Sequence, residues 1–216
     1  MRLNRYIVEA EDSQTVINET IALLRKDCGP FLKDLSKAER GKFVYRGIKR
    51  ALKTGSDTLV EKFKPRKDRW PTDIPQEIHE YTNKELKAKF GWFPRTEGVF
   101  ASSSFMVAAN FGIPMLFFPI GKYKYVFSPN VGDFLGALER EGVIYHSGNK
   151  WTVDRSYDRE TREDRIDDIL DRYSNKFLWG GINSDAELIF NCKGYYLIDT
   201  SALKGGRFDF EEEIWK

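Results

Sequence analysis

The sequence predicts an α+β fold, in which a helical N-terminal part precedes strands that are separated by helices. Apolar residues recur at helical spacing near the N-terminus, and short runs of β-branched and aromatic residues follow. The intervals between these runs do not give the regular βαβ units of a doubly wound sheet. With 216 residues, of which 41% are hydrophobic, the chain is long enough to bury a substantial core.

The N-terminal residues 1–40 are predicted to form a helical cap. Asp12 or Ser13 can cap a helix that ends at Gly29-Pro30. The apolar residues of this helix recur at helical spacing, at Ile17, Ile21 and Leu24. A second short helical turn is expected from Phe31 to Leu35.

The middle of the chain alternates between predicted strands and helices. We expect a strand at 42–48, followed by a polar surface excursion at 54–75 that three prolines interrupt. A helix is expected from Ile78 to Phe90, with Gly91 at its end, and a further strand at 98–102. Ser103 or Ser104 can cap the short helix that follows and runs to Gly112.

The second half is predicted to contain two strand pairs and two helices. Aromatic runs at 115–120 and 123–127, split at Gly121, are interpreted as paired strands, and so are 187–191 and 195–198. Helices are expected at 134–143 and 166–173, with a charged linker over 155–165. The whole chain, 1–216, is interpreted as one domain, with a core over 42–199 and a tail over 200–216.

The charge balance argues against a general nucleic-acid binder, because 35 Lys+Arg face 33 Asp+Glu. The densest basic run, Lys62 to Trp70, is interpreted as a solvated loop in preference to a phosphate-binding surface. The sequence has no apolar run of the length of a spanning helix or a signal peptide. We therefore expect a cytoplasmic protein, or one that is delivered into a host or target cell, without membrane contact.

Several cofactor classes are not expected. The sequence has no G-x-G-x-x-G after a strand and no G-x-x-x-x-G-K, which are typical of Rossmann and P-loop proteins. Cys28 and Cys192 are too few and too isolated for a disulfide framework or a metal site, and His79 and His146 have no partner pattern. The predicted site therefore contains no metal.

Three short strings occur in a suggestive order: Val-Tyr-Arg-Gly at 44–47, Gly-Val-Phe-Ala-Ser-Ser-Ser at 98–104 and Asp-Ala-Glu-Leu-Ile at 185–189. Together they resemble the Arg, Ser-x-Ser and x-x-Glu elements of the toxin-like NAD-dependent mono-ADP-ribosyltransferases. The resemblance implies split mixed β-sheets that form an NAD cleft. It also implies transfer of ADP-ribose from NAD, as co-substrate, to a macromolecular acceptor, with release of nicotinamide.

The resemblance gives Arg46, Ser102 and Glu187 catalytic roles that suit their chemistry. A guanidinium binds phosphate oxygens in bidentate fashion, so Arg46 is the expected ligand of the pyrophosphate. Ser102 is expected to hold the catalytic carboxylate, and Glu187 to stabilise the cation that develops on the ribose. Gly47 leaves the backbone open for contact with the nicotinamide carboxamide.

Further residues are assigned to NAD and to the acceptor. An aromatic ring should stack on the nicotinamide, with Phe111 as first choice and Phe117 as second. Asp185 stands where family members have Glu or Gln, and its carboxylate favours an arginine side chain of a protein as acceptor. Trp179, before a Gly-Gly hinge, resembles the family's target-recognising turn; the alternative is a core anchor beside a flexible turn.

Two other functions remain open at this stage. One is a catalytically inactive relative that has kept the fold as a binding or structural module. The other is a nucleic-acid-modifying or nucleic-acid-binding protein that uses residues 62–69 together with the many aromatic residues.

Overall fold

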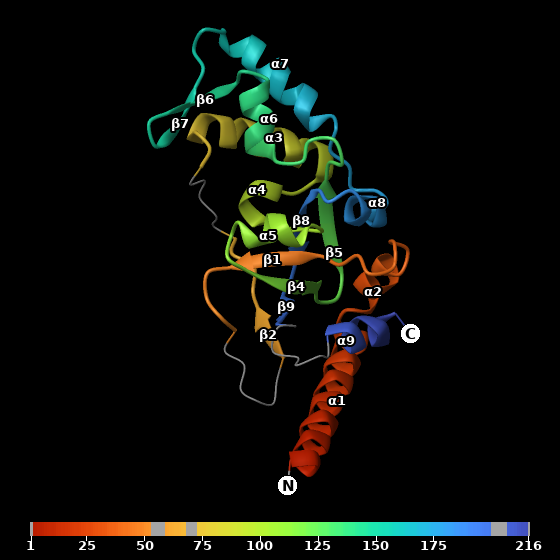
Figure 1. Cartoon of the computed structure of the whole chain (residues 1–216). Helices are drawn as coiled ribbons and strands as arrows, with labels where there is room; N and C mark the ends of the chain where they lie inside the picture. Colours follow the sequence, from red (N-terminus) through yellow and green to blue (C-terminus); the bar gives the residue numbers. More distant parts are fainter. Residues whose placement is uncertain (1, 53–58, 68–72, 200–206, 216) are drawn as a thin grey trace. The chain divides into compact units, whose positions relative to one another are not determined.

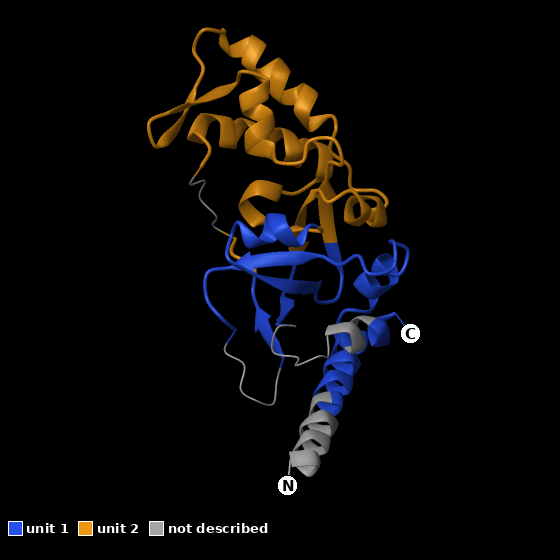
Figure 2. Cartoon of the chain, viewed as in Figure 1, with its two compact units in different colours: residues 1–64, 104–123, 192–216 blue, residues 65–103, 124–191 orange. Residues whose placement is uncertain are grey.

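The fold is α+β, as the sequence predicts, and a computed structural model describes residues 2–52, 59–67, 73–199 and 207–215 (Figure 1). The chain divides into two compact units (Figure 2). Unit 1 consists of residues 1–64, 104–123 and 192–216, and unit 2 of residues 65–103 and 124–191. Each unit is therefore assembled from segments that lie far apart in the sequence.

Unit 1 contains four antiparallel strands in the order β2-β9-β4-β1. These are β1 (Tyr45–Ile48), β2 (Val60–Phe63), β4 (Ile113–Pro119) and β9 (Tyr195–Ile198). The central strand β4 buries five consecutive residues, from Met115 to Pro119. Such a run is expected for a strand with a neighbour on both edges and covered faces.

The helices of unit 1 are α1 (Arg2–Asp27), α2 (Gly29–Leu35), α5 (Phe105–Ala109) and α9 (Arg207–Ile214). Helix α1 buries Ile17, Ile21 and Leu24, which confirms the predicted apolar face. It begins at Arg2, so the predicted cap at Asp12 or Ser13 is wrong. Helix α9 lies in the predicted tail and buries Phe210 completely.

Unit 2 contains strands in the order β3-β8-β5, a separate hairpin of β6 and β7, and five helices in its described residues. The strands are β3 (Val99–Ser102), β5 (Tyr123–Phe127), β6 (Ile144–Ser147), β7 (Lys150–Val153) and β8 (Glu187–Cys192). The first residue of β5 and the last residue of β8 are assigned to unit 1. The helices are α3 (Gln76–Phe90), α4 (Pro94–Glu97), α6 (Phe134–Arg140), α7 (Arg159–Leu170) and α8 (Leu178–Asn183).

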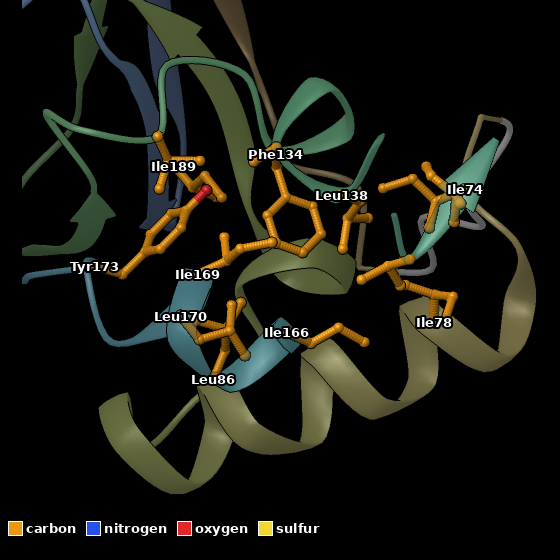
Figure 3. Close-up of a cluster of buried hydrophobic side chains, with 14 of the residues drawn as sticks. Ile74, Ile78, Leu86, Phe134, Leu138, Ile166, Ile169, Leu170, Tyr173 and Ile189 are labelled. Atoms are coloured by element: carbon orange, nitrogen blue, oxygen red, sulfur yellow. The ribbon is translucent and has the colours of Figure 1, made fainter. Parts of the chain in front are cut away.

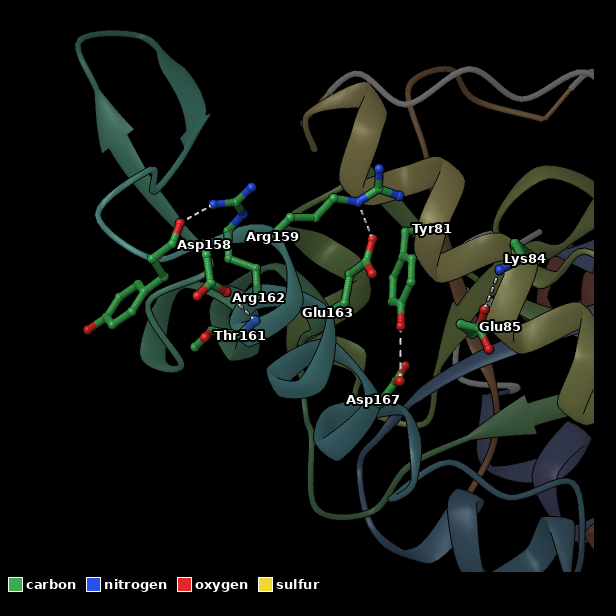
Figure 4. Close-up of polar contacts among 10 residues, drawn as sticks. Tyr81, Lys84, Glu85, Asp158, Arg159, Thr161, Arg162, Glu163 and Asp167 are labelled. Carbon is green, nitrogen blue, oxygen red and sulfur yellow. Dashed lines mark hydrogen bonds and ion pairs between the residues drawn. The ribbon is translucent and has the colours of Figure 1, made fainter.

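Unit 2 has a hydrophobic core of its own, to which helices α3, α6 and α7 contribute (Figure 3). Leu86, Phe134 and Ile169 are among its buried members. Each such side chain contributes about 1.5–3 kcal/mol when it leaves water. Helices α3 and α7 are also joined by a polar contact, in which the Tyr81 hydroxyl of α3 donates a 2.9 Å hydrogen bond to Asp167 of α7 (Figure 4).

Several local predictions are confirmed. Helix α3 ends at Phe90, and Gly91 follows in the left-handed conformation with φ 76° and donates to the Lys87 carbonyl at 2.8 Å. Ser104 caps α5 by accepting a hydrogen bond from the Val107 N–H. Strands β1 and β3 lie within the predicted ranges, and β8 begins at the predicted residue and extends one residue beyond the predicted end.

Both predicted strand pairs are wrong. Strand β4 pairs with β1 and β9, not with the neighbouring run 123–127. Strand β9 pairs with β2 and β4, whereas β8 pairs with β3. Apolar patterning locates strands in the sequence, but the partner of each strand is decided by long-range packing that the pattern does not contain.

Two predicted irregular segments contain regular structure. The prediction of a linker at 155–165 is wrong over most of that range, because α7 begins at Arg159 with Asp158 as its N-cap. The excursion 54–75 contains β2, while its residues 54–58 and 68–72 lie outside the described part of the chain. The hairpin of β6 and β7 was not predicted.

Candidate functional site

Ser102 and Glu187 lie directly opposite each other on the antiparallel strands β3 and β8. Side chains of opposed residues in such a pair project from the same face, with Cβ atoms about 4.5–5.5 Å apart. Ser102 is only 4% exposed, and the Glu187 side chain is 21% exposed. The two predicted catalytic residues of unit 2 are therefore brought together in a largely buried setting.

A glycine allows the turn from α4 into β3 to pack against β8. A Cβ atom on Gly98 would lie 2.2 Å from the Ile189 Cγ2 atom and 2.2 Å from the Pro94 carbonyl oxygen. No side chain fits at these distances without displacing the backbone. Gly98 thus sets the close approach that places the end of β3 beside Glu187.

Glu187 also faces an arginine that the sequence did not indicate. The Arg95 Nη1 atom of α4 lies 3.9 Å from the Glu187 Oε1 atom, with Arg95 12% exposed. The Arg95 guanidinium lies 4.4 Å from the ring centroid of Phe134 and 5.3 Å from that of Phe100. Burial raises the pKa of the nearby Tyr173 hydroxyl, and the charge of Glu187 raises it further.

The three serines have different contacts. Ser102 opposes Glu187, and Ser104 caps α5 in unit 1. The Ser103 hydroxyl is buried and donates a 3.3 Å hydrogen bond to the Gly181 carbonyl of α8. Ser103 thereby connects the end of β3 with the segment that was predicted to recognise the acceptor.

That segment differs from its prediction in one respect. Gly180 and Gly181 lie inside helix α8, and a Cβ atom on Gly181 would meet the Phe127 ring at 2.7 Å. Gly181 is therefore a packing residue and not a hinge. Trp179 is 39% exposed and Phe177 68% exposed, with ring centroids 6.1 Å apart, so the alternative of Trp179 as a core anchor is wrong.

Asp185 is exposed and precedes β8 in the left-handed conformation, with φ 56°. Asp185 is not part of the strand, so strand alternation does not place its side chain on the same side as that of Glu187. Its side chain direction follows from the turn instead. Asp185 is accessible to a macromolecule.

In unit 1, Arg46 lies over an aromatic platform. Its guanidinium carbon is 5.7 Å from the ring centroid of Tyr195, and the Tyr195 ring stacks on Phe63 at 5.5 Å. Burial raises the pKa of the Tyr195 hydroxyl, while the charge and hydrogen bond of Arg46 oppose that rise. Arg46 is thus held by a residue of β9 that the sequence did not indicate.

Gly47 is required by the packing of α5. A Cβ atom on Gly47 would lie 2.1 Å from the Ala108 carbonyl oxygen and 2.9 Å from the Phe111 Cβ atom. Phe111 is 63% exposed, whereas Phe117 is 1% exposed and its ring lies 5.1 Å from that of Tyr195. Of the two predicted stacking residues, Phe111 is the one whose ring a ligand can reach.

Other predicted features have local contacts. His79 lies 3.3 Å from the Thr96 hydroxyl, and His146 packs edge-on against Trp151. In the basic run, Lys62 lies over Tyr196, while residues 68–70 are outside the described part of the chain. Within the described ranges, no cluster of His, Cys, Asp and Glu has the grouping that a metal ion needs.

Among the described helices, none combines the length and the apolar character needed to cross a membrane.

Comparison with protein-family models, with curated proteins and with solved structures finds no match to this chain.

Proposed function

We propose that this protein is an NAD-dependent mono-ADP-ribosyltransferase with an ADP-ribosyltransferase-like fold. The observation that carries the proposal is the opposition of Ser102 and Glu187 on β3 and β8. A carboxylate that stabilises a ribose cation must be fixed in direction, and a short hydroxyl side chain on the facing strand can fix it. The strands themselves are rigid supports.

In the proposed reaction the bond between the ribose C1′ atom and the nicotinamide nitrogen breaks, and its electron pair leaves with neutral nicotinamide. The acceptor nucleophile forms the new bond to C1′ and loses one proton. Glu187 stabilises the positive charge on the ribose, which is largest in the transition state. Arg46 binds the pyrophosphate, and the Gly47 backbone binds the nicotinamide carboxamide.

We propose a protein side chain as acceptor, with arginine favoured. Exposed Asp185 and the exposed aromatic pair Phe177 and Trp179 support this choice. A carboxylate attracts a guanidinium, and an aromatic face binds one through its π-electrons. The Asp185 side chain can also take part in removing the guanidinium proton.

The decisive test replaces Glu187 by Gln. The Glu187→Gln variant should transfer ADP-ribose about 10²- to 10³-fold more slowly, as is usual when a group that stabilises transition-state charge is lost. Its dissociation constant for NAD should change little, because the charge acts mainly in the transition state. Biotinylated NAD, a whole-cell lysate and nicotinamide release provide the measurement.

Glu77→Gln is the matched control, because Glu77 is half exposed and pairs with Arg155 in the same unit. It should retain wild-type transfer. If wild type neither labels an acceptor nor releases nicotinamide, the proposal is wrong and an inactive module is the better interpretation. Label on nucleic acid in place of protein would correct the acceptor class.

A further inference from the structure

Arg95 combines burial, an immobilised backbone and proximity to Glu187. The Arg95 N–H donates a 3.2 Å hydrogen bond to the Asn83 side-chain oxygen, and the Asn83 amide donates to the Thr96 hydroxyl at 2.7 Å. These bonds tie α4 to α3. The Arg95 side chain then lies over the rings of Phe134 and Phe100, which limits its rotamers.

The distance between the two charges indicates how they interact. The separation of 3.9 Å between Arg95 Nη1 and Glu187 Oε1 is longer than the 2.7–3.2 Å of a typical hydrogen bond. Arg95 therefore acts on Glu187 through its charge and does not occupy a carboxylate oxygen. Since both side chains are mostly buried, screening by water is weak and the charge effect is large.

We infer that Arg95 is a positioning residue, which keeps the Glu187 carboxylate charged and oriented for reaction. The inference rests on the proposed transferase function. An arginine guanidinium keeps its positive charge at every pH at which proteins are folded, so Arg95 provides a permanent counter-charge. Without it, a carboxylate in this setting would take up a proton at higher pH.

Two other described groups near this carboxylate carry no positive charge. Ser102 opposes Glu187 from β3 and is neutral. Burial raises the pKa of the Tyr173 hydroxyl, and the charges of Glu187 and Asp133 raise it further against the opposing charge of Arg95, so the hydroxyl is protonated at neutral pH. Arg95 provides the positive charge of the ion pair that the structure describes for Glu187.

The first test needs no activity. The side-chain carboxyl signal of Glu187 is followed by carbon NMR from pH 3 to pH 9 and assigned by its absence in Glu187→Gln. In Arg95→Met the titration midpoint should move to higher pH by at least about one pH unit, because a neighbouring cation typically lowers it by that much. Arg95→Lys, which restores a cation, should move it less.

The second test measures the pH dependence of NAD turnover. In Arg95→Met the acid limb of the kcat profile should move to higher pH by the same amount, while KM for NAD stays within about twofold of wild type, since the charge acts in the transition state. Arg165→Met is the control: Arg165 stacks on Tyr157 at 3.8 Å in the same unit. It should leave both profiles unchanged.

The outcomes separate the two proposals. An unchanged Glu187 midpoint in Arg95→Met, or an equal shift in Arg165→Met, overturns the role of Arg95. Absence of NAD turnover in wild type overturns the transferase function, while the NMR titration still reports the coupling. If Arg95→Met does not fold, the Arg95→Lys variant decides between the two roles. A Glu187 titration midpoint equal to that of wild type, together with a reduced kcat and an altered KM for NAD, would mean that Arg95 has only a structural role.

Discussion

Gly47 shows how a single missing side chain sets the position of a neighbouring helix. Replacement of Gly47 by Ala would place a Cβ atom 2.1 Å from the Ala108 carbonyl oxygen, so α5 or β1 has to shift. Overpacking of this kind costs about 1–3 kcal/mol. We expect Gly47→Ala to lower the free energy of unfolding by that amount, measured by denaturant titration.

Gly29 provides the matched control in the same unit. No atom lies within 4 Å of a Cβ atom built on Gly29, and its φ is not in the left-handed region. Gly29→Ala should therefore change stability by less than about 1 kcal/mol, with an increase favoured by the helix propensity of alanine. Equal stability of the two variants would contradict the packing explanation for Gly47.

The residues of the candidate site differ in how far the sequence can predict them. The order of the strings makes Ser102 and Glu187 candidates, and the strand register places them opposite each other. Arg95 and Tyr195 carried no such signal. Their contacts with Glu187 and Arg46 depend on segments distant in the sequence, so only the fold identifies them.

Helix α8 contains two neighbouring glycines with different surroundings. A Cβ atom on Gly180 meets nothing within 4 Å, whereas one on Gly181 meets the Phe127 ring and Leu188 at 2.7 and 2.9 Å. Gly180→Ala should therefore preserve or raise stability, by up to about 1 kcal/mol. Gly181→Ala should lower it by about 1–3 kcal/mol. Thermal unfolding measures both.

The same pair of variants tests the hinge hypothesis for this segment. If Gly180 and Gly181 provided only backbone freedom, both alanine variants would impair the proposed transfer equally and leave stability unchanged. The packing interpretation instead predicts a loss confined to Gly181→Ala. A stable Gly181→Ala protein would therefore disprove it.

At the level of whole elements, the sequence predicts where a helix such as α3 ends but does not predict which strands pair with each other. Gly91 ends α3 because glycine adopts the left-handed conformation at low cost, so its position in the sequence predicts the end of the helix. The partners of β4 and β9 depend on contacts across the fold. The hairpin of β6 and β7 was missed because Tyr145, His146 and Ser147 are exposed and lack the apolar alternation of a half-buried strand.

At the scale of the whole molecule, the chain passes repeatedly between the two units. Segments 104–123 and 192–216 return to unit 1 after the excursions through unit 2. The linear division into cap, core and tail therefore does not coincide with the compact units. Both cysteines belong to unit 1, although Cys192 lies at the end of β8.

The cysteine thiols should therefore report on unit 1 alone. Cys28 and Cys192 are free and buried, and burial raises the pKa of each to about 12. Because the thiolate is the reactive form, labelling of the folded protein by iodoacetamide at pH 8 should be slow. Its rate should rise about tenfold per pH unit up to pH 10, without the plateau of an exposed thiol whose pKa is about 8.5.

Labelling in guanidinium chloride should become fast at the denaturant concentration at which unit 1 unfolds. The Cys28→Ser variant leaves the Cys192 thiol at the end of β8, and the Cys192→Ser variant leaves the Cys28 thiol at the start of α2. Each variant therefore reports on one position. Because both thiols lose their protecting burial when the same unit unfolds, the two variants should show the same midpoint. Rapid labelling of either thiol in the folded protein at pH 8, with a plateau above pH 9, would contradict the burial of that cysteine.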